Sequence, residues 1–382
     1  MSRILIAGDF VPQGRAAQLI AAGRSNQLFA PVKPLIEGAD YSIVNLECAV
    51  ADASSRPIRK AGACLKCTPD DVKALRQAGF RMVTLANNHF ADYGTRGMEL
   101  SLDAIRQAGL DYVGAGLNLT EASQTRFITL PSGSRCAFIN CCEHEFSIAT
   151  DTRAGCHPLN PVHQFRQIAQ AKTKTDYTIV IVHGGHEHFP LPSPRMQETY
   201  RFFIDAGADA VVGHHQHCPS GYEHYHDRPI VYGLGNFCFD RGADADSLPA
   251  GWHEGYMVEL LLEQGRVDCR LHPYEQCREE AVIRPLNDRT AFDATIERLN
   301  AVITEPAQLK RAVEDYYDQC VGEALGIHEP WPNIVHVLRA LLRLVRPALL
   351  SHHRYAARNQ VCCESHLDKL RHALLRLTPP EP

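Results

Sequence analysis

Side chains that commonly bind metal ions recur in this chain directly after short apolar runs. They include carboxylates, an amide and several imidazoles, but no cysteine. Hard oxygen donors beside imidazoles suit Mn, Fe or Zn better than Ca or a cysteine-rich structural zinc site. The five places, in chain order, are Asp9, Glu47, Asn88 with His89, His183, and the run from His214 to His217.

Each of these residues alone has an ordinary structural explanation. An Asp or Asn after a strand is a common turn former, and a single histidine is often a hydrogen-bonded surface or core residue. Turn preference does not account for five such places with mixed donor chemistry. The pattern therefore predicts a metal site.

The apolar runs that precede these residues have the length and composition of β-strands, and helix-like segments alternate with them. Such alternation is typical of an α/β fold. Because the carboxyl ends of strands in an open α/β sheet face a common crevice, we expect the metal-binding side chains to converge there. The runs are Ile4 to Ala7, Ser42 to Leu46, Met82 to Ala86, Phe127 to Leu130, Cys136 to Asn140, Thr178 to Val182, Ala210 to Val212 and Pro229 to Tyr232.

Helix and turn signals lie between the strands. The segment Thr68-Pro69-Asp70-Asp71 predicts the start of a helix, because Thr is a good N-cap, Pro fits the first helical position and acidic residues suit the first turn. This helix is predicted to end at Gly79. Further helices are predicted at Gly94 to Ala108 and near Pro194 to Ala206. Strands at Met257 to Leu262 and Val267 to Leu271 predict a hairpin.

After about Pro285 the strand-like runs stop and helix formers dominate. We therefore predict one domain over residues 1–285 and a C-terminal helical region over residues 286–382. Within that region, Ile334 to Val345 has an apolar face opposite Arg339, Arg343 and Arg346. The pattern fits a helix docked on the main domain, and it also fits one that meets an acidic protein partner or a membrane surface.

Composition excludes several classes of protein. Apolar residues make up 45% of the 382 residues, and the formal net charge of −5 gives no general attraction to nucleic acid. The chain begins Met1-Ser2-Arg3 with no signal-like segment, and no apolar run is long enough for a transmembrane helix. We expect a cytoplasmic protein whose fourteen cysteines stay reduced and serve mainly in packing. Cys64-x-x-Cys67 lacks a sequence partner for a zinc site.

Taken together, the motifs resemble the CapA family of poly-γ-glutamate capsule biosynthesis proteins, which is similar to the calcineurin-like metallophosphoesterases. They appear in the family's order between residue 3 and about residue 240. The resemblance implies a four-layer α/β/β/α sandwich with a two-metal site. The motifs are Gly8-Asp9, Asn45-Leu46-Glu47, Ala86-Asn87-Asn88-His89 with Asp92-Tyr93-Gly94, His183-Gly184-Gly185-His186-Glu187, Gly213-His214-His215-Gln216-His217 and Tyr232-Gly233-Leu234-Gly235-Asn236-Phe237.

The resemblance also implies roles for individual residues. Two divalent ions would be held by Asp9, Glu47, Asn88, His183, His215 and His217, with Glu47 as the bridging ligand. His89 would be the catalytic partner. Four further residues would contact substrate or support the ligands, namely Glu187, Asn45, His214 and Asn236.

Two positions depart from the family pattern. Gly184 stands where relatives usually carry a tryptophan, so substrate stacking on that ring is not expected. Val11 stands where the broader phosphoesterases often carry the histidine of Asp-x-His, which leaves the first metal with one protein ligand fewer.

The resemblance implies a metal-dependent hydrolase, in which a metal-activated water attacks an anionic phosphoester and His89 protonates the leaving oxygen. It links the protein to the biosynthesis of poly-γ-glutamate or capsule. Two alternatives stay open. The centre could bind an anionic polymer without cleaving it, as an assembly component, or it could hydrolyse an amide or an ester.

Overall fold

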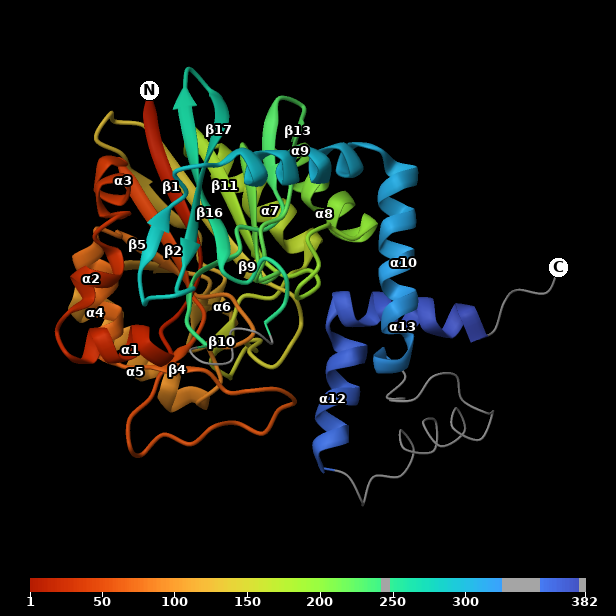
Figure 1. Ribbon diagram of the computed structural model, residues 1–382, viewed down its shortest axis with the longest axis horizontal. Coiled ribbons are helices and arrows are strands. Elements are labelled where there is room, and N and C mark those ends of the chain that lie inside the picture. The colour runs from red at the N-terminus through yellow and green to blue at the C-terminus, as the bar shows by residue number, and fades with distance from the viewer. Residues whose placement is uncertain (242–247, 325–350, 378–382) are drawn as a thin grey trace.

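The computed structural model describes residues 1–241, 248–324 and 351–377. Two large β-sheets pack face to face, and helices cover the outer face of each sheet (Figure 1). The predicted α/β/β/α sandwich with C-terminal helices is confirmed.

The first sheet is built around the N-terminal strand. Its order is β18-β17-β16-β1-β2-β5-β6, and β15 also pairs with β1. The strands β1, β2, β5 and β6 run parallel, whereas β16, β17 and β18 are antiparallel to their neighbours. Their bounds are β1 Ser2–Val11, β2 Tyr41–Leu46, β5 Met82–Thr84, β6 Asp111–Val113, β15 Asn236–Phe239, β16 Glu254–Glu263, β17 Arg266–Gln276 and β18 Ile283–Pro285.

The predicted hairpin is the β16–β17 pair, in which Glu263 opposes Arg266. The two residues between them, Gln264 and Gly265, have φ values of 50° and 78°. A two-residue turn with positive φ at both positions matches the right-handed twist of the paired strands.

The second sheet has the order β13-β14-β12-β11-β9-β8. Its bounds are β8 Arg126–Thr129, β9 Arg135–Cys142, β11 Tyr177–His183, β12 Ala210–His214, β13 Tyr222–Tyr225 and β14 Arg228–Val231. Two short ladders lie outside both sheets. They pair β3 Ala49–Val50 with β4 Lys66–Cys67, and β7 Ala115–Gly116 with β10 Gly155–Cys156.

Helices pack on both outer faces. The predicted helix after Thr68 is α4, which begins with a capping box between Thr68 and Asp71 and ends at Gly79, where φ is 109°. The first sheet carries α1 Gly14–Ala21, α2 Ser25–Phe29, α3 Lys33–Gly38, α4 Pro69–Ala78 and α5 Gly94–Ala108. The second carries α7 Pro161–Lys172 and α8 Pro194–Asp205, and a short α6 Leu119–Ala122 lies beside β7.

The central strand β1 contributes side chains to two apolar cores. Ile4 and Ile6 point into the core between the sheets, whereas Leu5 and Ala7 join the core under α1 to α5. Burial on both faces explains why this strand is a continuous apolar run instead of an alternating one.

Four described helices follow β18. They are α9 Thr290–Thr304, α10 Pro306–Ala324, α12 Ser351–Cys362 and α13 Glu364–Leu377. Phe292, Ile296 and Leu299 of α9 belong to the core that the second sheet uses. The division into domains at residue 285 stays a prediction, but α9 packs as part of the main body.

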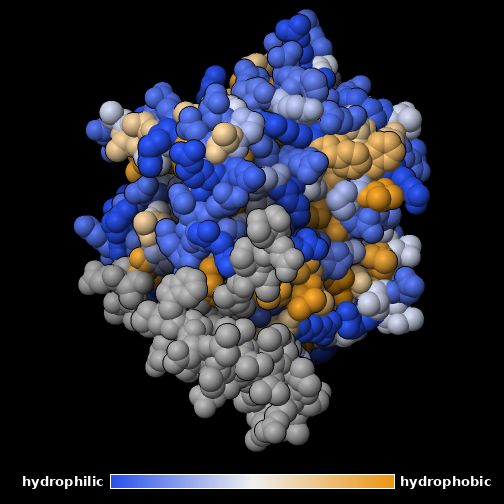
Figure 2. Space-filling model, turned by 90° about the vertical axis from the view of Figure 1, so that its right-hand side faces the viewer, coloured by the Kyte–Doolittle hydropathy of each residue, from blue (hydrophilic) through white to orange (hydrophobic). Residues whose placement is uncertain are grey.

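The C-terminal helices lie on the side of the molecule that Figure 2 shows, which is mostly hydrophilic with scattered apolar areas. Val361 on α12 and Leu374 and Leu375 on α13 are among the exposed apolar side chains. The amphipathic segment predicted from Ile334 to Arg346 lies outside the described residues. In the part of the chain that the structure describes, no helix is both long and apolar enough to cross a membrane.

Most of the fourteen cysteines are buried. This agrees with their interpretation as mainly packing residues. Cys64, half-buried, donates from its thiol to the carbonyl of Ile58 at 3.7 Å.

Candidate metal centre

The metal-binding side chains collect where parallel strands of the two sheets end. Asp9 lies near the end of β1, and Glu47 directly follows β2. His183 and His214 are the last residues of the neighbouring strands β11 and β12. Because both sheets bring their parallel strands to the same edge of the sandwich, residues more than 200 positions apart in sequence become neighbours.

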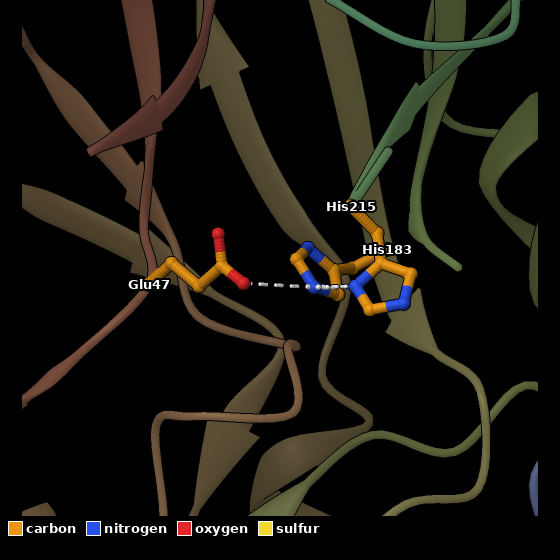
Figure 3. A group of neighbouring side chains, drawn as sticks. All are labelled: Glu47, His183 and His215. Carbon is orange, nitrogen blue, oxygen red and sulfur yellow. Dashed lines mark hydrogen bonds and ion pairs between the residues drawn. The ribbon is translucent and has the colours of Figure 1, made fainter. Parts of the chain in front are cut away.

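Glu47, His183 and His215 form the first group of the centre, and all three are buried. His183 Nε2 lies 3.4 Å from Glu47 Oε1 and 3.1 Å from His215 Nδ1. Figure 3 shows the carboxylate and the two imidazoles directed toward one another. Asn88 belongs to the same side, since its Oδ1 is 3.1 Å from His183 Nε2.

A second group shares Glu47 and adds Asp9 and His217. His217 Nε2 is 3.7 Å from Glu47 Oε1, and His217 Nδ1 is 3.5 Å from Asp9 Oδ2. Glu47 thus stands between the two groups. The structure brings together all six side chains that the family resemblance implied as metal ligands.

Two asparagines hold these groups in place. Asn236 Oδ1 lies 2.9 Å from His217 Nδ1, while the Asn236 amide nitrogen donates to two backbone carbonyls. Because a carbonyl oxygen only accepts, His217 must donate from Nδ1, which leaves the Nε2 lone pair facing Glu47. Asn45 donates to Asp9 Oδ1 at 2.8 Å and accepts from Thr84 and Asn87.

His89 lies beside the centre in a small polar network. Its Nδ1 is 2.7 Å from Asp92 Oδ2 and 3.1 Å from the ammonium of Lys60. Lys60 in turn pairs with Asp92 Oδ1 at 2.5 Å, and both side chains are almost fully buried. The carboxylate of Asp92 therefore fixes the ring of His89 through Nδ1.

The remaining predicted residues lie close by. One carboxylate oxygen of Glu187 and ring nitrogens of His215 and His217 all lie within 4.8 Å of one another. Among the described residues, the buried ring of His214 finds no hydrogen-bond partner for either nitrogen. Burial is the main cause that lowers the pKa of His214, so the ring stays neutral near pH 7.

The backbone of the Gly213-His214-His215-Gln216-His217 motif is strained. His215 and His217 have φ values of 103° and 56°, a region that residues other than glycine seldom adopt. Such conformations cost of order 1–3 kcal/mol each and persist where the surrounding structure holds them. Here they turn two imidazoles from one short segment toward the shared carboxylate of Glu47.

The electrostatics of the centre fit a bound cation. Both carboxylate oxygens of Glu47 are buried without a hydrogen-bond partner among the described residues. Burial, and then the nearby carboxylate of Asp9, raises the pKa of Glu47 well above its ordinary value. Burial, and then the neighbouring His215, lowers the pKa of His183. A buried carboxylate facing neutral imidazoles provides a donor set typical of divalent metal sites.

The two departures from the family pattern have structural explanations. Val11 is fully buried in the core under the outer helices, so its side chain does not join the metal groups. At Gly184, an added Cβ would lie 2.6 Å from Cγ of Glu143. The Glu143 side chain therefore occupies the space next to Gly184.

Sequence reasoning missed Lys60 and Glu145. Lys60 lies in the loop between β3 and β4, where no periodic pattern marks it. Glu145 Oε1 is 3.8 Å from His215 Nε2. It lies in the loop after β9, behind Glu143 and His144, so the rule that looks directly after a strand does not single it out.

Known proteins are similar to a large part of this chain. The family described as "Bacterial capsule synthesis protein PGA_cap" matches residues 3–241. The capsule biosynthesis protein CapA of Bacillus anthracis is 33% identical over 245 residues, which cover 62% of this chain and 59% of that protein. The PGA biosynthesis protein CapA of Bacillus subtilis is 32% identical over 239 residues, which cover 62% of each chain.

A probable polyglutamine synthesis accessory protein of Mycobacterium tuberculosis is 29% identical over 236 residues, covering 58% of this chain and 60% of that protein. The chain thus matches about 60% of the length of these curated relatives. A crystal structure of TT1561 from Thermus thermophilus is 12% identical with a TM-score of 0.37, and the match covers 71% of this chain and 98% of that one.

Proposed function

This chain belongs to the bacterial capsule synthesis protein family PGA_cap, and from that premise we propose that it is a metal-dependent hydrolase of the phosphoesterase type. Its substrate would be an anionic molecule or polymer in poly-γ-glutamate or capsule biosynthesis. The observation that carries the proposal is the buried Glu47 carboxylate, which two groups of metal-binding side chains share, with His89 held beside it.

The residues present fit a pair of divalent ions, with Mn, Fe or Zn the metals that the donor set favours. Asp9, Glu47 and His217 would hold one ion, and Glu47, Asn88, His183 and His215 the other. When bound, such ions supply positive charge that polarises a phosphoryl or carbonyl oxygen and activates water. Asn236 and Asn45 orient the ligands.

His89 is the proposed catalytic residue. Its Nδ1 is engaged by Asp92, so Nε2 is the nitrogen left to pass a proton to the leaving oxygen of the substrate. Glu187, half exposed at the rim near His215 and His217, would meet the substrate or its counter-ions. The cytoplasmic location and a protein partner for the C-terminal helices stay predictions.

Hydrolysis of p-nitrophenyl phosphate and of its bis ester tests the proposal. Protein freed of metal is reloaded with Mn, Zn, Fe or Mg, and turnover is compared with metal content. We expect metal-dependent turnover that His89→Ala lowers by roughly 10²- to 10⁴-fold, with metal content unchanged. His226→Ala, which alters an exposed histidine, is the matched control.

Full metal content without turnover of either ester would reject the phosphoesterase. It would favour the alternative of a component that binds an anionic polymer, in keeping with the description of the M. tuberculosis relative as an accessory protein. Turnover of p-nitrophenyl acetate alone would instead identify a hydrolase that acts on carbon.

A further inference from the structure

A second cluster of metal-binding side chains lies between the loop after β9 and the start of α13. Its members are Glu145, Cys363 and His366, and one potential ligand atom from each lies within 4.8 Å of the others. Cys363 is 1% exposed, and the Glu145 side chain is 10% exposed. Thiolate, imidazole and carboxylate are the three donor types that zinc accepts in proteins.

Helix geometry places the two C-terminal donors side by side. Cys363 lies between α12 and α13, and His366 lies three residues later in the first turn of α13. Residues three apart on a helix share one face.

Hydrogen bonds hold both sides of the cluster in fixed positions. Asn359 of α12 donates to Glu145 Oε2 at 3.1 Å. Glu364 accepts from the backbone of His144 at 2.8 Å and pairs with its ring at 2.7 Å. The β9 loop and α13 are therefore already docked at the spot where the three donors meet.

A half-buried arginine adds to this docking. Arg195 of α8 contacts Glu143 of the β9 loop and Asp368 of α13, each at 2.7 Å. Glu143 thus has a cationic partner in Arg195, and Glu364 pairs with His144. Glu145 is met by the neutral amide of Asn359, with His215 at 3.8 Å, so its negative charge is available to a cation.

We propose that Glu145, Cys363 and His366 bind a zinc ion that fastens α12 and α13 to the rim of the metal centre. Three protein ligands leave the fourth tetrahedral position to water. Cys363 and His366 lie beyond residues 3–241, which the family comparison covers, whereas Glu145 lies within them, so the site joins the matched part of the chain to the C-terminal helices. It does not depend on the proposed hydrolase activity.

Cobalt substitution of the full-length protein tests the site. A thiolate bound to Co²⁺ gives a charge-transfer band in the near ultraviolet, and no ligand proposed for the main centre is a cysteine. We expect the band in the wild-type protein, its loss in Cys363→Ser and its retention in Cys362→Ser. Cys362 is the exposed neighbour and serves as the matched control.

Zinc content gives a second readout. Cys363→Ser should hold one equivalent of zinc less than Cys362→Ser under the same dialysis. Because a serine at this buried position could disturb folding, His366→Gln is measured as well, and it should weaken zinc binding by at least about tenfold. Absence of the thiolate band in the wild-type protein, or a band that survives in Cys363→Ser, would overturn the proposal whatever the esterase assay shows.

Discussion

At the scale of single residues, Asn236 shows how one amide can set the strength of a metal site. Its side-chain oxygen accepts a hydrogen bond from Nδ1–H of His217, and the lone pair of Nε2 therefore faces Glu47. Partners of this kind typically change metal affinity by 10- to 100-fold when they are removed. Asn236→Ser should therefore weaken Mn binding by roughly that factor.

Calorimetric titration of metal-free protein with Mn checks this prediction. Asn26→Ser, an exposed change on α2, is the control and should bind as the wild type does. Equal affinity in Asn236→Ser and Asn26→Ser would show that the amide does not orient the ligand.

Asp92 plays a positioning role for His89. Asp92→Asn keeps the shape of the side chain but replaces the carboxylate that faces His89 Nδ1 and Lys60. We expect turnover to fall roughly 10- to 100-fold, which is part of the rate factor that a general acid contributes. KM and metal content should stay near wild type. Asp103→Asn, at an exposed surface pair, is the control.

A conservative substitution shows whether Asp92→Asn lowers turnover because His89 is misplaced or because the fold is damaged. The conservative Asp92→Glu should restore part of the turnover, and circular dichroism should show the same fold in both variants. A higher KM with kcat unchanged would contradict the role assigned to Asp92.

Most of the proposed ligands could be found from the sequence because each follows an apolar run typical of a buried strand. Asp9, Glu47 and His183 are examples, and the edge at which strands end defines their meeting point. Lys60 could not be found in this way. Its partner depends on the path of a loop, and loop paths follow from tertiary contacts instead of from periodicity.

At the scale of secondary-structure elements, the start of α4 tests whether a local sequence signal contributes to stability. Thr68 accepts from the backbone N–H of Asp71, and the Asp71 carboxylate accepts from the Thr68 backbone. Thr68→Ala should lower the free energy of unfolding by about 1 kcal/mol. Urea denaturation measures it, with the exposed Thr95→Ala in α5 as control.

The connection from β10 to α7 contains a buried neutral histidine. His157 donates from Nδ1 to the carbonyl of Asn140 and accepts at Nε2 from the amide of Gln164. Burial, together with a smaller effect of the neighbouring His163, lowers the pKa of His157 to about 4.

Since the unfolded chain has a histidine pKa near 6.5, it binds more protons than the folded protein between pH 6.5 and 4. The stability from neutral His157 is complete above that window and is lost as pH falls through it. His157→Gln should reduce the loss of unfolding free energy between pH 6.5 and pH 4 by up to about 3 kcal/mol. Urea melts at pH 7 and pH 4.5 check this, with exposed His226→Gln as control; equal pH slopes in the two variants would contradict the prediction.

At the scale of the whole molecule, Arg195 connects three parts of the chain that are distant in sequence. It joins α8 to the β9 loop through Glu143 and to α13 through Asp368. Arg195→Gln would leave the buried Glu143 carboxylate without its cation, which should cost about 3 kcal/mol of unfolding free energy. Arg96→Gln, which breaks an exposed pair with Asp52, should cost less than about 1 kcal/mol.

Chemical denaturation of both arginine variants, followed by far-ultraviolet circular dichroism, measures the difference. Similar small losses would mean that α13 does not depend on this contact. Strand-like runs predicted an α/β fold and helix formers predicted the C-terminal helices, whereas the resemblance to the CapA family implied the four-layer sandwich. The sequence did not predict where α9 and α13 dock, since an apolar helix face does not specify which surface will cover it.

The position of β1 has a consequence for the order in which the protein can form during synthesis. Ile4 pairs with Leu260 of β16, so the first strand to leave the ribosome waits for a partner made about 250 residues later. At 5–20 residues per second this delay is roughly 10 to 50 s. During that time one edge of β1, the strand that carries Asp9, has no antiparallel neighbour. The proposed metal centre also waits for His217, so it can be completed only late in translation, and the Ser2 to Ile6 part of that edge stays unpaired until β16 is made.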